Sequence, residues 1–526
     1  MFCKTELTRA VADICGMVVG GTTNAQPSRL TQMSASTPPS PDDATVTATP
    51  LLGLVAAPQL LSSPMQRYGA HAVVIGASLA GLCAARVLSD YYDKVSIYER
   101  DELPDGPANR SAVPQGRHVH LLMARGAAEF DGLFPGLLED MVAAGVPMLE
   151  NRPDCIHFGA AGHVLGTATT LRDEFTAYVP SRPHLEWQIR RRALAIPNVE
   201  LVREAVAEPR FDPTQERVTG VLLEAGDESS AVPADLVVDA AGRGTRLPVW
   251  LEQWGYGRPR EDTVDVGITY ATHQVHIPEG LLKEKVVVAG ASRAHPVGLG
   301  MLFYEDGNWG LTTFGTGKVE PPQDFAEMCD LADELLPEHF ANAIRKGTTI
   351  GDVAFHKYPQ SRWRRYDEMK RFPIGVIPFG DAVVSFNPTF GQGMTMTAIQ
   401  AGNLRGVLDS GTPDIFARLA KATKKTTWPV WTMTVIGDLA LHNATGDAKW
   451  WYGPVGGLFD QFLGAAETDP VLAEWFLRRF SLLDSLWMVP STRLVGRTIR
   501  HNMSALLADK FGAKRRASDR DRVPSR

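Results

Sequence analysis

The chain has 526 residues, of which 44% are hydrophobic and 21% charged, shares that are typical of globular proteins and exclude a disordered or fibrous chain. The formal net charge of −7 offers no basic field for a phosphate backbone, so we expect no nucleic-acid partner. Five cysteines without CxxC or CxxH spacing indicate neither a disulfide framework nor a zinc site, and favour a reducing, cytoplasmic compartment. No apolar run reaches the roughly 18 residues that span a bilayer.

Residues 1–68 are rich in Ser, Thr, Ala and Pro and show no sustained helical or strand period. This composition predicts a disordered tail or a leader. Residues 10–21 form only a weak signal-like segment, because Asp13 interrupts the apolar run. Met65 stands just before the first expected strand, so a targeting leader and an over-long assigned start explain residues 1–64 equally well.

Regular structure is expected from His71, where the apolar run AVVIG predicts a buried parallel strand. A helix over residues 79–89 and a strand over residues 94–99 would complete a βαβ unit. Further predicted elements are a helix at 181–195 and strands at 199–203, 217–223 and 236–239. Residues 263–315 are strand-like and indicate a separate, mostly antiparallel sheet, whereas residues 415–507 are helical and rich in aromatic side chains.

These elements predict an α/β fold with a Rossmann-like domain in ββα layers around a parallel sheet, an inserted and mostly antiparallel substrate domain, and a C-terminal helical region. The Rossmann-like domain would comprise residues 69–145, 178–260 and 362–408. The substrate domain would comprise residues 146–177 and 261–361. The helical region would span residues 409–512 and precede a basic tail at 513–526.

The turn after the first strand, VVIGASLAGL, carries a dinucleotide-binding pattern. Gly76 would permit the tight turn and Gly81 the close approach of helix to sheet, while Ser78 stands where GxGxxG has its second glycine. The amides at this helix start, which include those of Leu79 and Ala80, would face an anionic pyrophosphate.

An acidic residue closes the second predicted strand, at the place where dinucleotide-binding units hold the ribose. Glu99 would accept hydrogen bonds from the adenosine ribose hydroxyls, and the adjacent Arg100 is assigned to the same site. A glycine-lined turn without a ligand is the alternative, but it leaves Glu99 unexplained. The pattern therefore predicts nucleotide binding.

A second glycine-rich stretch spans residues 372–404. A strand delivers Gly380 and Asp381, and the Asp381 carboxylate is placed to accept hydrogen bonds from a polyol such as a ribityl chain. The turn and helix start that follow comprise Pro388, Gly391, Gln392, Gly393 and Met394. Amides at this positive helix terminus would stabilise negative charge on a reduced flavin. An ordinary turn with Asp as a helix cap is the alternative.

Together the two stretches resemble FAD monooxygenases of the p-hydroxybenzoate hydroxylase type, which include squalene epoxidases. The resemblance covers roughly residues 70–410 and is nearest to an actinobacterial branch of polyether-antibiotic epoxidases, through the segments 113–122 (VPQGRHVHLL) and 239–251 (DAAGRGTRLPVWL). It implies that Arg110 contacts FAD, that Arg182 opens a long helix beside the cofactor, and that Asp381 and Met394 are late flavin contacts.

One motif departs from that family. Many single-component hydroxylases carry Asp-Gly, linked to nicotinamide and FAD binding, where this chain has Ala241 and Gly242. Two electron sources are therefore open, namely NAD(P)H bound directly and a separate flavin reductase partner.

The resemblance implies a hydroxylase or epoxidase of secondary metabolism that inserts one oxygen atom from O2, through a flavin C4a-hydroperoxide, into a hydrophobic polyene, polyketide or aromatic substrate. Since the cofactor carries this chemistry, no catalytic side chain is assigned. One alternative is a flavin-dependent reductase of prenyl or polyene double bonds. Another is a non-catalytic prenyl-binding escort protein, against which the presence of Glu99, Asp381 and the GQG turn speaks.

Two further features are interpreted more simply. His118 and His120 lack a third ligand, so packing near the flavin is expected and no metal site is predicted. The C-terminal tryptophans are expected to pack in a core, with a cover over a hydrophobic substrate or a peripheral membrane contact as alternatives. They are Trp428, Trp431, Trp450, Trp451, Trp475 and Trp487.

Overall fold

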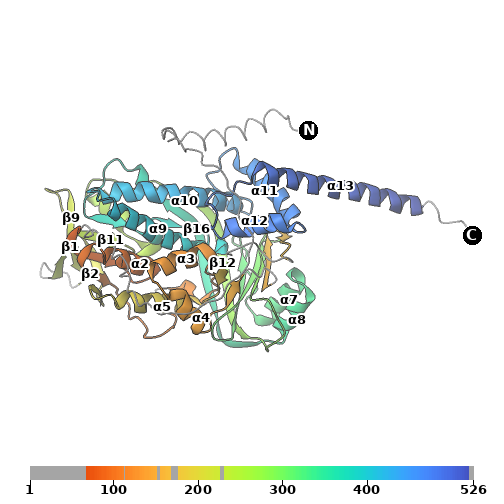
Figure 1. The fold of residues 1–526 in the computed structure, drawn as a ribbon, viewed down its shortest axis with the longest axis horizontal. Coiled ribbons are helices and arrows are strands. Elements are labelled where there is room, and N and C mark those ends of the chain that lie inside the picture. The colour runs from red at the N-terminus through yellow and green to blue at the C-terminus, as the bar shows by residue number, and fades with distance from the viewer. Residues whose placement is uncertain (1–66, 112, 151–154, 168–175, 225–229, 521–526) are drawn as a thin grey trace, which may run out of the picture. The chain divides into compact units, whose positions relative to one another are not determined.

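The computed structural model describes residues 67–111, 113–150, 155–167, 176–224 and 230–520, which belong to one unit, Met65–Arg526. The tail or leader predicted for residues 1–68 lies outside the described residues as far as residue 66. The expected α/β class is confirmed, with a parallel sheet, a larger mostly antiparallel sheet and helices at the C-terminal end (Figure 1).

The first sheet is parallel and has the strand order β17-β11-β1-β2-β7. Its strands are β1 (Gly69–Ile75), β2 (Tyr92–Tyr98), β7 (Val199–Val202), β11 (Leu236–Asp239) and β17 (Val376–Pro378). The edge strand β17 pairs with β11 through Val237 and Val376, and the amide of Phe379 donates to the carbonyl of Asp239 at 2.9 Å. This pairing brings the second glycine-rich stretch to the same end of the sheet as the first.

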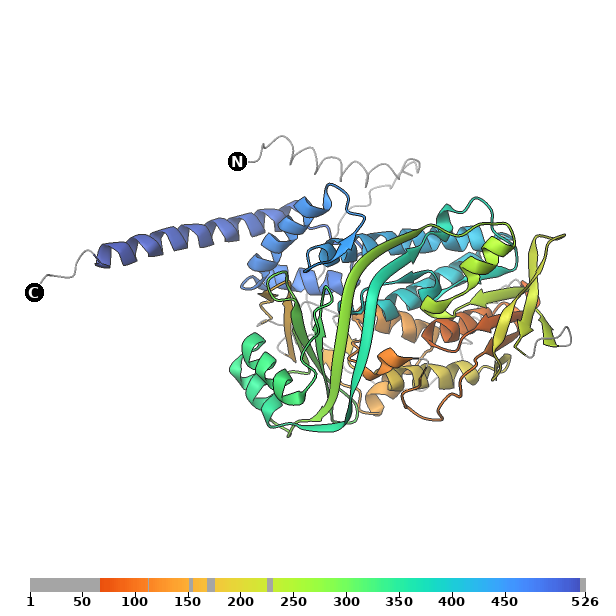
Figure 2. The same cartoon turned by 180° about the vertical axis from the view of Figure 1, so that it is seen from behind.

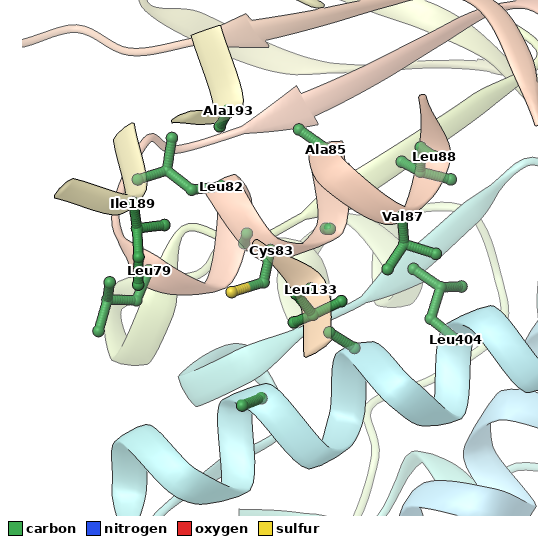
Figure 3. Close-up of a cluster of buried hydrophobic side chains, with 14 of the residues drawn as sticks. Leu79, Leu82, Cys83, Ala85, Val87, Leu88, Leu133, Ile189, Ala193 and Leu404 are labelled. Atoms are coloured by element: carbon green, nitrogen blue, oxygen red, sulfur yellow. The ribbon is translucent and has the colours of Figure 1, made fainter. Parts of the chain in front are cut away.

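Helix α2 (Leu79–Leu88) is buried on several sides because nearly all of its residues are apolar. Its neighbours are α3 (Ala124–Leu133), α5 (Arg182–Leu194) and α9 (Gly393–Asp409). Figure 3 shows side chains of α2, among them Leu82 and Val87, together with Leu133 of α3, Ile189 of α5 and Leu404 of α9. Burial of this one helix fixes the first turn against the rest of the core.

The second sheet is built on two long antiparallel strands, β12 (Glu261–His276) and β16 (Thr348–Arg364), which curve together along the molecule in Figure 2. Beyond β12 it continues with β15 (Trp309–Gly315), β14 (Val297–Phe303), β13 (Val286–Ala289), β4 (Ile156–Ala160) and β5 (His163–Val164). Among the described strands of this sheet, only β13 and β4 run parallel. The mostly antiparallel sheet expected at 263–315 is therefore confirmed, and β16 is a member that the sequence did not single out.

Smaller elements complete the fold. Among the described residues they are β3 (Met148–Glu150) with β6 (Thr176–Tyr178), β8 (Val206–Asp212) with β9 (Arg217–Leu223) and β10 (Ala231–Pro233), β18 (Val384–Ser385), β19 (Thr445–Gly446), α4 (Leu137–Ala143), α6 (Leu247–Gln253), α7 (Phe325–Leu335) and α8 (Glu338–Arg345).

The C-terminal region consists of α10 (Ile415–Leu439), α11 (Tyr452–Ala466), α12 (Pro470–Phe480) and α13 (Thr492–Arg520). Helix α13 continues through residues 513–520, where the sequence predicted a basic tail, because Ala, Lys and Arg in that stretch favour a helix. Within the described part of the chain, no helix combines the length and the apolar character needed to cross a bilayer.

The interface of α2 with α9 makes a stability prediction. Leu404 is fully buried there, so Leu404→Ala should lower the free energy of unfolding by about 2–5 kcal/mol, through lost burial and the cavity left behind. Leu458→Ala, on the exposed side of α11, should change it by less than about 0.5 kcal/mol. Urea denaturation of both variants measures the difference, and equal losses would contradict this account of the core.

Candidate functional site

One cavity of about 1520 Å³ joins the two glycine-rich stretches. This volume exceeds the roughly 300–1,000 Å³ of a usual ligand pocket, so it has room for a cofactor and a substrate together. Of the sixteen residues assigned to cofactor binding, Gly81 and Gly380 are outside the lining and the other fourteen are in it. Those fourteen are Gly76, Ser78, Leu79, Ala80, Glu99, Arg100, Arg110, Arg182, Asp381, Pro388, Gly391, Gln392, Gly393 and Met394.

The first turn requires its two glycines. Gly76 has a φ of +99°, and a Cβ there would lie 2.9 Å from the carbonyl oxygen of Ala240. A Cβ on Gly81 would lie 1.8 Å from the carbonyl oxygen of Gly76, a distance that no side chain can occupy. Ser78, the N-cap of α2, makes no side-chain capping bond, so the helix start offers its amides to an anionic group in the cavity.

The second stretch touches the first helix directly. Gly380 has a φ of +65°, and a Cβ there would lie 2.5 Å from the Cβ of Ala80. Its amide donates to Oε1 of Gln400 on α9 at 2.7 Å. Gly380 therefore acts through close packing, which places the following Asp381 on the cavity wall.

Glu99 is held at the first end of the cavity. Its Oε2 accepts from the amide of Ala77 at 3.0 Å and from Nη1 of Arg110 at 3.2 Å. Arg110 also places its Nε 2.8 Å from Oε1 of Glu186, a residue to which the sequence assigned no role. The glutamate after β2 is therefore linked to the glycine turn and to helix α5.

Glu186 joins the two arginines that the family resemblance implies. Nη2 of Arg182 lies 3.1 Å from Oε2 of Glu186 and donates to Oγ of Ser78 at 3.0 Å. The side chains of these two residues and of Arg110 and Glu99 are at most 10% exposed, so two cations and two carboxylates balance in a buried cluster. The position four residues after Arg182 on one helix was the available signal for Glu186.

At the other end, the start of α9 opens on the cavity. Its N-cap, Gln392, makes no side-chain capping bond, and a Cβ on Gly393 would meet no atom within 4 Å. Burial raises the pKa of Asp381, and the arginines of the cavity, first Arg243, act in the opposite direction. This end presents helix amides and one carboxyl group to the same space.

A buried carboxyl group of the C-terminal region stabilises the Pro388 turn, which precedes α9. Asp438, on α10, is fully buried and accepts from Nδ2 of Asn387 at 2.6 Å and from Oγ of Ser361 at 3.4 Å. Asn387 in turn accepts from the amide of Thr389 at 2.9 Å, at the Pro388 turn. Nothing local in the sequence identifies Asp438, because its partners come from two distant segments.

Three aromatic rings lie close together on the side of the cavity formed by the antiparallel sheet. The ring of His118 lies 5.6 Å from that of Tyr270 and 5.8 Å from that of His356, and all three residues line the cavity. Nδ1 of His118 bonds to Oγ1 of Thr272 at 2.7 Å. Nε2 of His118 and the hydroxyl of Tyr270 are buried without a hydrogen-bond partner among the described residues.

These histidines are suited to packing and hydrogen bonding in the neutral state. Burial lowers the pKa of His118 to about 4 and that of His120 to about 3. Across the residues that the structure describes, no group of three or more His, Cys, Asp or Glu is arranged to hold a metal ion.

The tryptophans do not cover the cavity. None of the six C-terminal tryptophans, all of which the structure describes, is in the lining. Trp431 is buried in the core against Trp363, whereas Trp450 is 75% exposed. The C-terminal side chains that line the cavity are smaller ones, among them Phe459, Leu463, Phe476 and Phe480. The alternative that tryptophans cover a substrate is therefore not supported.

The close contact at the first turn makes a prediction about cofactor content. Gly81→Ala must displace α2 from the turn, so the purified variant should lose most of its bound FAD, measured by absorbance after release. Gly406→Ala is the matched control, since a Cβ there meets open space, and it should keep its FAD and be as stable as the parent or slightly more so. Full FAD occupancy in Gly81→Ala would show that the turn does not hold the cofactor.

Asp438 makes a prediction about pH. Burial raises its pKa from 3.8 to about 7, so the folded chain keeps a proton that the unfolded chain releases, and stability falls as pH rises through this range. Asp438→Asn keeps an acceptor for Asn387 and removes the titration. The variant should therefore gain roughly 2–3 kcal/mol relative to the parent between pH 5 and pH 8, measured by urea denaturation. A difference independent of pH would contradict a raised pKa.

Known proteins are similar to this chain in sequence or in fold. Protein Rv3254 of Mycobacterium tuberculosis is 65% identical over 452 residues, which cover 84% of this chain and 95% of that protein. Residues 446–515 match a family model described as the Mycobacterium Rv3254 C-terminal domain. Kynurenine 3-monooxygenase of Salinispora arenicola is 28% identical over 63% of this chain and 70% of its own length.

A solved structure extends the likeness to the fold. The structure of pqsL, described as a probable FAD-dependent monooxygenase from Pseudomonas aeruginosa, superposes with a TM-score of 0.54 and 14% identity over 74% of this chain and 100% of that one. At that identity the likeness concerns the fold alone, and it agrees with the predicted Rossmann-like and antiparallel parts. Because the sequence identity to Protein Rv3254 is 65% and the match covers 95% of that protein, this chain belongs to the family of Protein Rv3254.

Proposed function

We propose that the chain is an FAD-dependent monooxygenase that acts on a hydrophobic substrate. One observation carries the proposal: a single cavity connects the Glu99 end, the Asp381 end and the rings around His118. A monooxygenase needs cofactor and substrate side by side in one enclosed space. The relative described as kynurenine 3-monooxygenase supports the same class of reaction.

The residues at the two ends fit FAD. The uncapped amides of α2 would hold the pyrophosphate, with Arg110 and Arg182 nearby, and Glu99 would accept from the ribose hydroxyls. Asp381 would accept from the ribityl chain, and the α9 amides would face the flavin ring. When bound and reduced, FAD supplies the electrons that activate O2.

The source of those electrons is part of the proposal. Ala241 and Gly242 line the cavity at the end of β11, where the amide of Ala241 donates to Oδ1 of Asp239 at 3.1 Å. Asp239 is buried, and this burial raises its pKa. Its carboxyl group is bonded within the turn, through the amide of Ala241. We therefore propose that the electrons come either from NAD(P)H or from a separate flavin reductase.

The substrate would be largely apolar with one polar group. Aromatic and aliphatic side chains of α11 and α12, such as Phe459 and Phe476, line the part of the cavity contributed by the C-terminal helices. Nε2 of His118 and the hydroxyl of Tyr270 would bind a hydroxyl or carbonyl oxygen of that substrate, because buried polar atoms are rarely left unpaired. A neutral His118 can serve in this way without charging the cavity.

We propose more specifically that the protein epoxidises or hydroxylates a polyene, polyketide or aromatic compound. It is supported by the resemblance of segments 113–122 and 239–251 to polyether epoxidases, and residues of both segments line the cavity. The first segment contributes His118 and the second contributes Arg243, whose guanidinium lies 4.4 Å from the ring centre of Tyr358. Both segments would thus contact the cofactor or the substrate.

A spectroscopic experiment tests the function. The purified full-length chain should contain about one FAD, lose the oxidised flavin spectrum with anaerobic NADPH alone or with an added flavin reductase, and regain it with O2. With a substrate present, labelled dioxygen should place one labelled atom in the product. Reoxidation by a polyene without O2 would indicate a double-bond reductase instead, and a colourless protein that binds prenyl chains would indicate an escort protein.

A further inference from the structure

Helix α13 carries a stripe of exposed apolar side chains. Its members are between 41% and 62% exposed, and they recur at intervals of three and four residues, which places them on one side of the helix. They are Val495, Ile499, Met503, Leu506 and Leu507. Isolated exposed leucines are ordinary, but a continuous apolar stripe marks an interaction surface.

The opposite side of α13 is fixed to the neighbouring helices. Thr498 is buried, and Leu494 packs against the cluster that contains residues of α11 and α12. Arg497 forms an ion pair with Asp469. At the edge of the stripe, Nδ2 of Asn502 donates to Oε1 of Gln461 at 3.1 Å. These contacts set the rotation of the helix about its axis, so the apolar stripe is turned away from α11 and α12.

The charge of α13 is opposite to that of the whole chain. Residues 492–520 contain eight Arg or Lys and two Asp, a net charge of +6, while the complete chain has −7. The basic residues are Arg493, Arg497, Arg500, Lys510, Lys514, Arg515, Arg516 and Arg520. Arg493 and Arg500 are exposed and flank the beginning of the stripe. A helix that combines an apolar stripe with flanking cations suits an anionic lipid surface.

We propose that α13 lies on an anionic membrane surface, with the stripe from Val495 to Leu507 buried at the boundary between headgroups and acyl chains. The exposed cations Arg493 and Arg500 contact the lipid phosphates. The contacts of Arg497 with Asp469 and of Asn502 with Gln461 hold the rest of the unit on the aqueous side. The proposal does not depend on the flavin chemistry, although it would bring the cavity close to hydrophobic substrates.

Pairing with a second copy fits the helix less well. A coiled-coil seam that continues from Ile499, Met503 and Leu506 would place Lys510 at the next seam position. Six net positive charges on each helix would also repel one another in a pair of copies. The same charge attracts the helix to phosphatidylglycerol and other anionic lipids.

Vesicle sedimentation of the full-length protein tests the proposal. The protein should sediment with vesicles of phosphatidylglycerol and phosphatidylcholine at least about tenfold more strongly than with pure phosphatidylcholine, and added salt should weaken the binding. Met503→Glu with Leu506→Glu should reduce binding by about tenfold or more, and Arg493→Gln with Arg500→Gln should reduce it and weaken its salt dependence. The matched control is Ile350→Glu, at an exposed apolar position on β16, which should bind like the parent.

FAD content and the unfolding midpoint should be unchanged in all these variants, which separates loss of membrane binding from misfolding and from failure of the proposed function. Absence of sedimentation with anionic vesicles, or equal binding by the Met503→Glu/Leu506→Glu variant, would overturn the proposal. Self-association that this variant abolishes, without vesicle binding, would identify a second copy as the occupant. Vesicle binding that requires removal of residues 1–66 would identify that segment as the occupant, and would also overturn the proposal.

Discussion

The contact between the backbone of Gly81 and the carbonyl of Gly76 is the constraint on which the site depends. It fixes the start of α2 directly over the end of β1, with no space for any side chain. Gly380 then packs against Ala80 at that helix start, so a loop that is distant in sequence is placed by the same helix. Burial of α2 on several sides makes this arrangement rigid, because any shift of the helix would disturb α3, α5 and α9 together.

Much of this arrangement could be predicted because its causes are local. An apolar strand followed by a glycine at a positive φ is compatible with few other local structures. The strands expected at 217–223 and 236–239 have the same bounds in the structure. The pairing of β17 with β11 was not predicted, because the two strands are more than 130 residues apart in the sequence. The long strand β16 was not singled out, because its outer residues alternate weakly between apolar and polar and its partner β12 supplies the pairing.

The rest of the site depends on partners that are far apart in the sequence. Glu186 belongs to the site because Arg110, from another segment of the chain, forms an ion pair with it. Asp438 lies in a helix that the sequence marked as aromatic core, and its role is visible only when Asn387 is placed against it. The tryptophans attracted attention by their size, but large rings satisfy core packing, and phenylalanines of moderate size line the cavity instead.

The origin of the cavity wall has a consequence for divergence within the family. Phe459 and Phe476 belong to the segment that matches its own family model, whereas both glycine-rich stretches precede that segment. Mutations in α11 and α12 can therefore alter which molecules fit the cavity, while both glycine-rich stretches stay unchanged. Relatives with the same two glycine-rich stretches can in this way differ in the molecules that they accept, through changes near the carboxyl end alone.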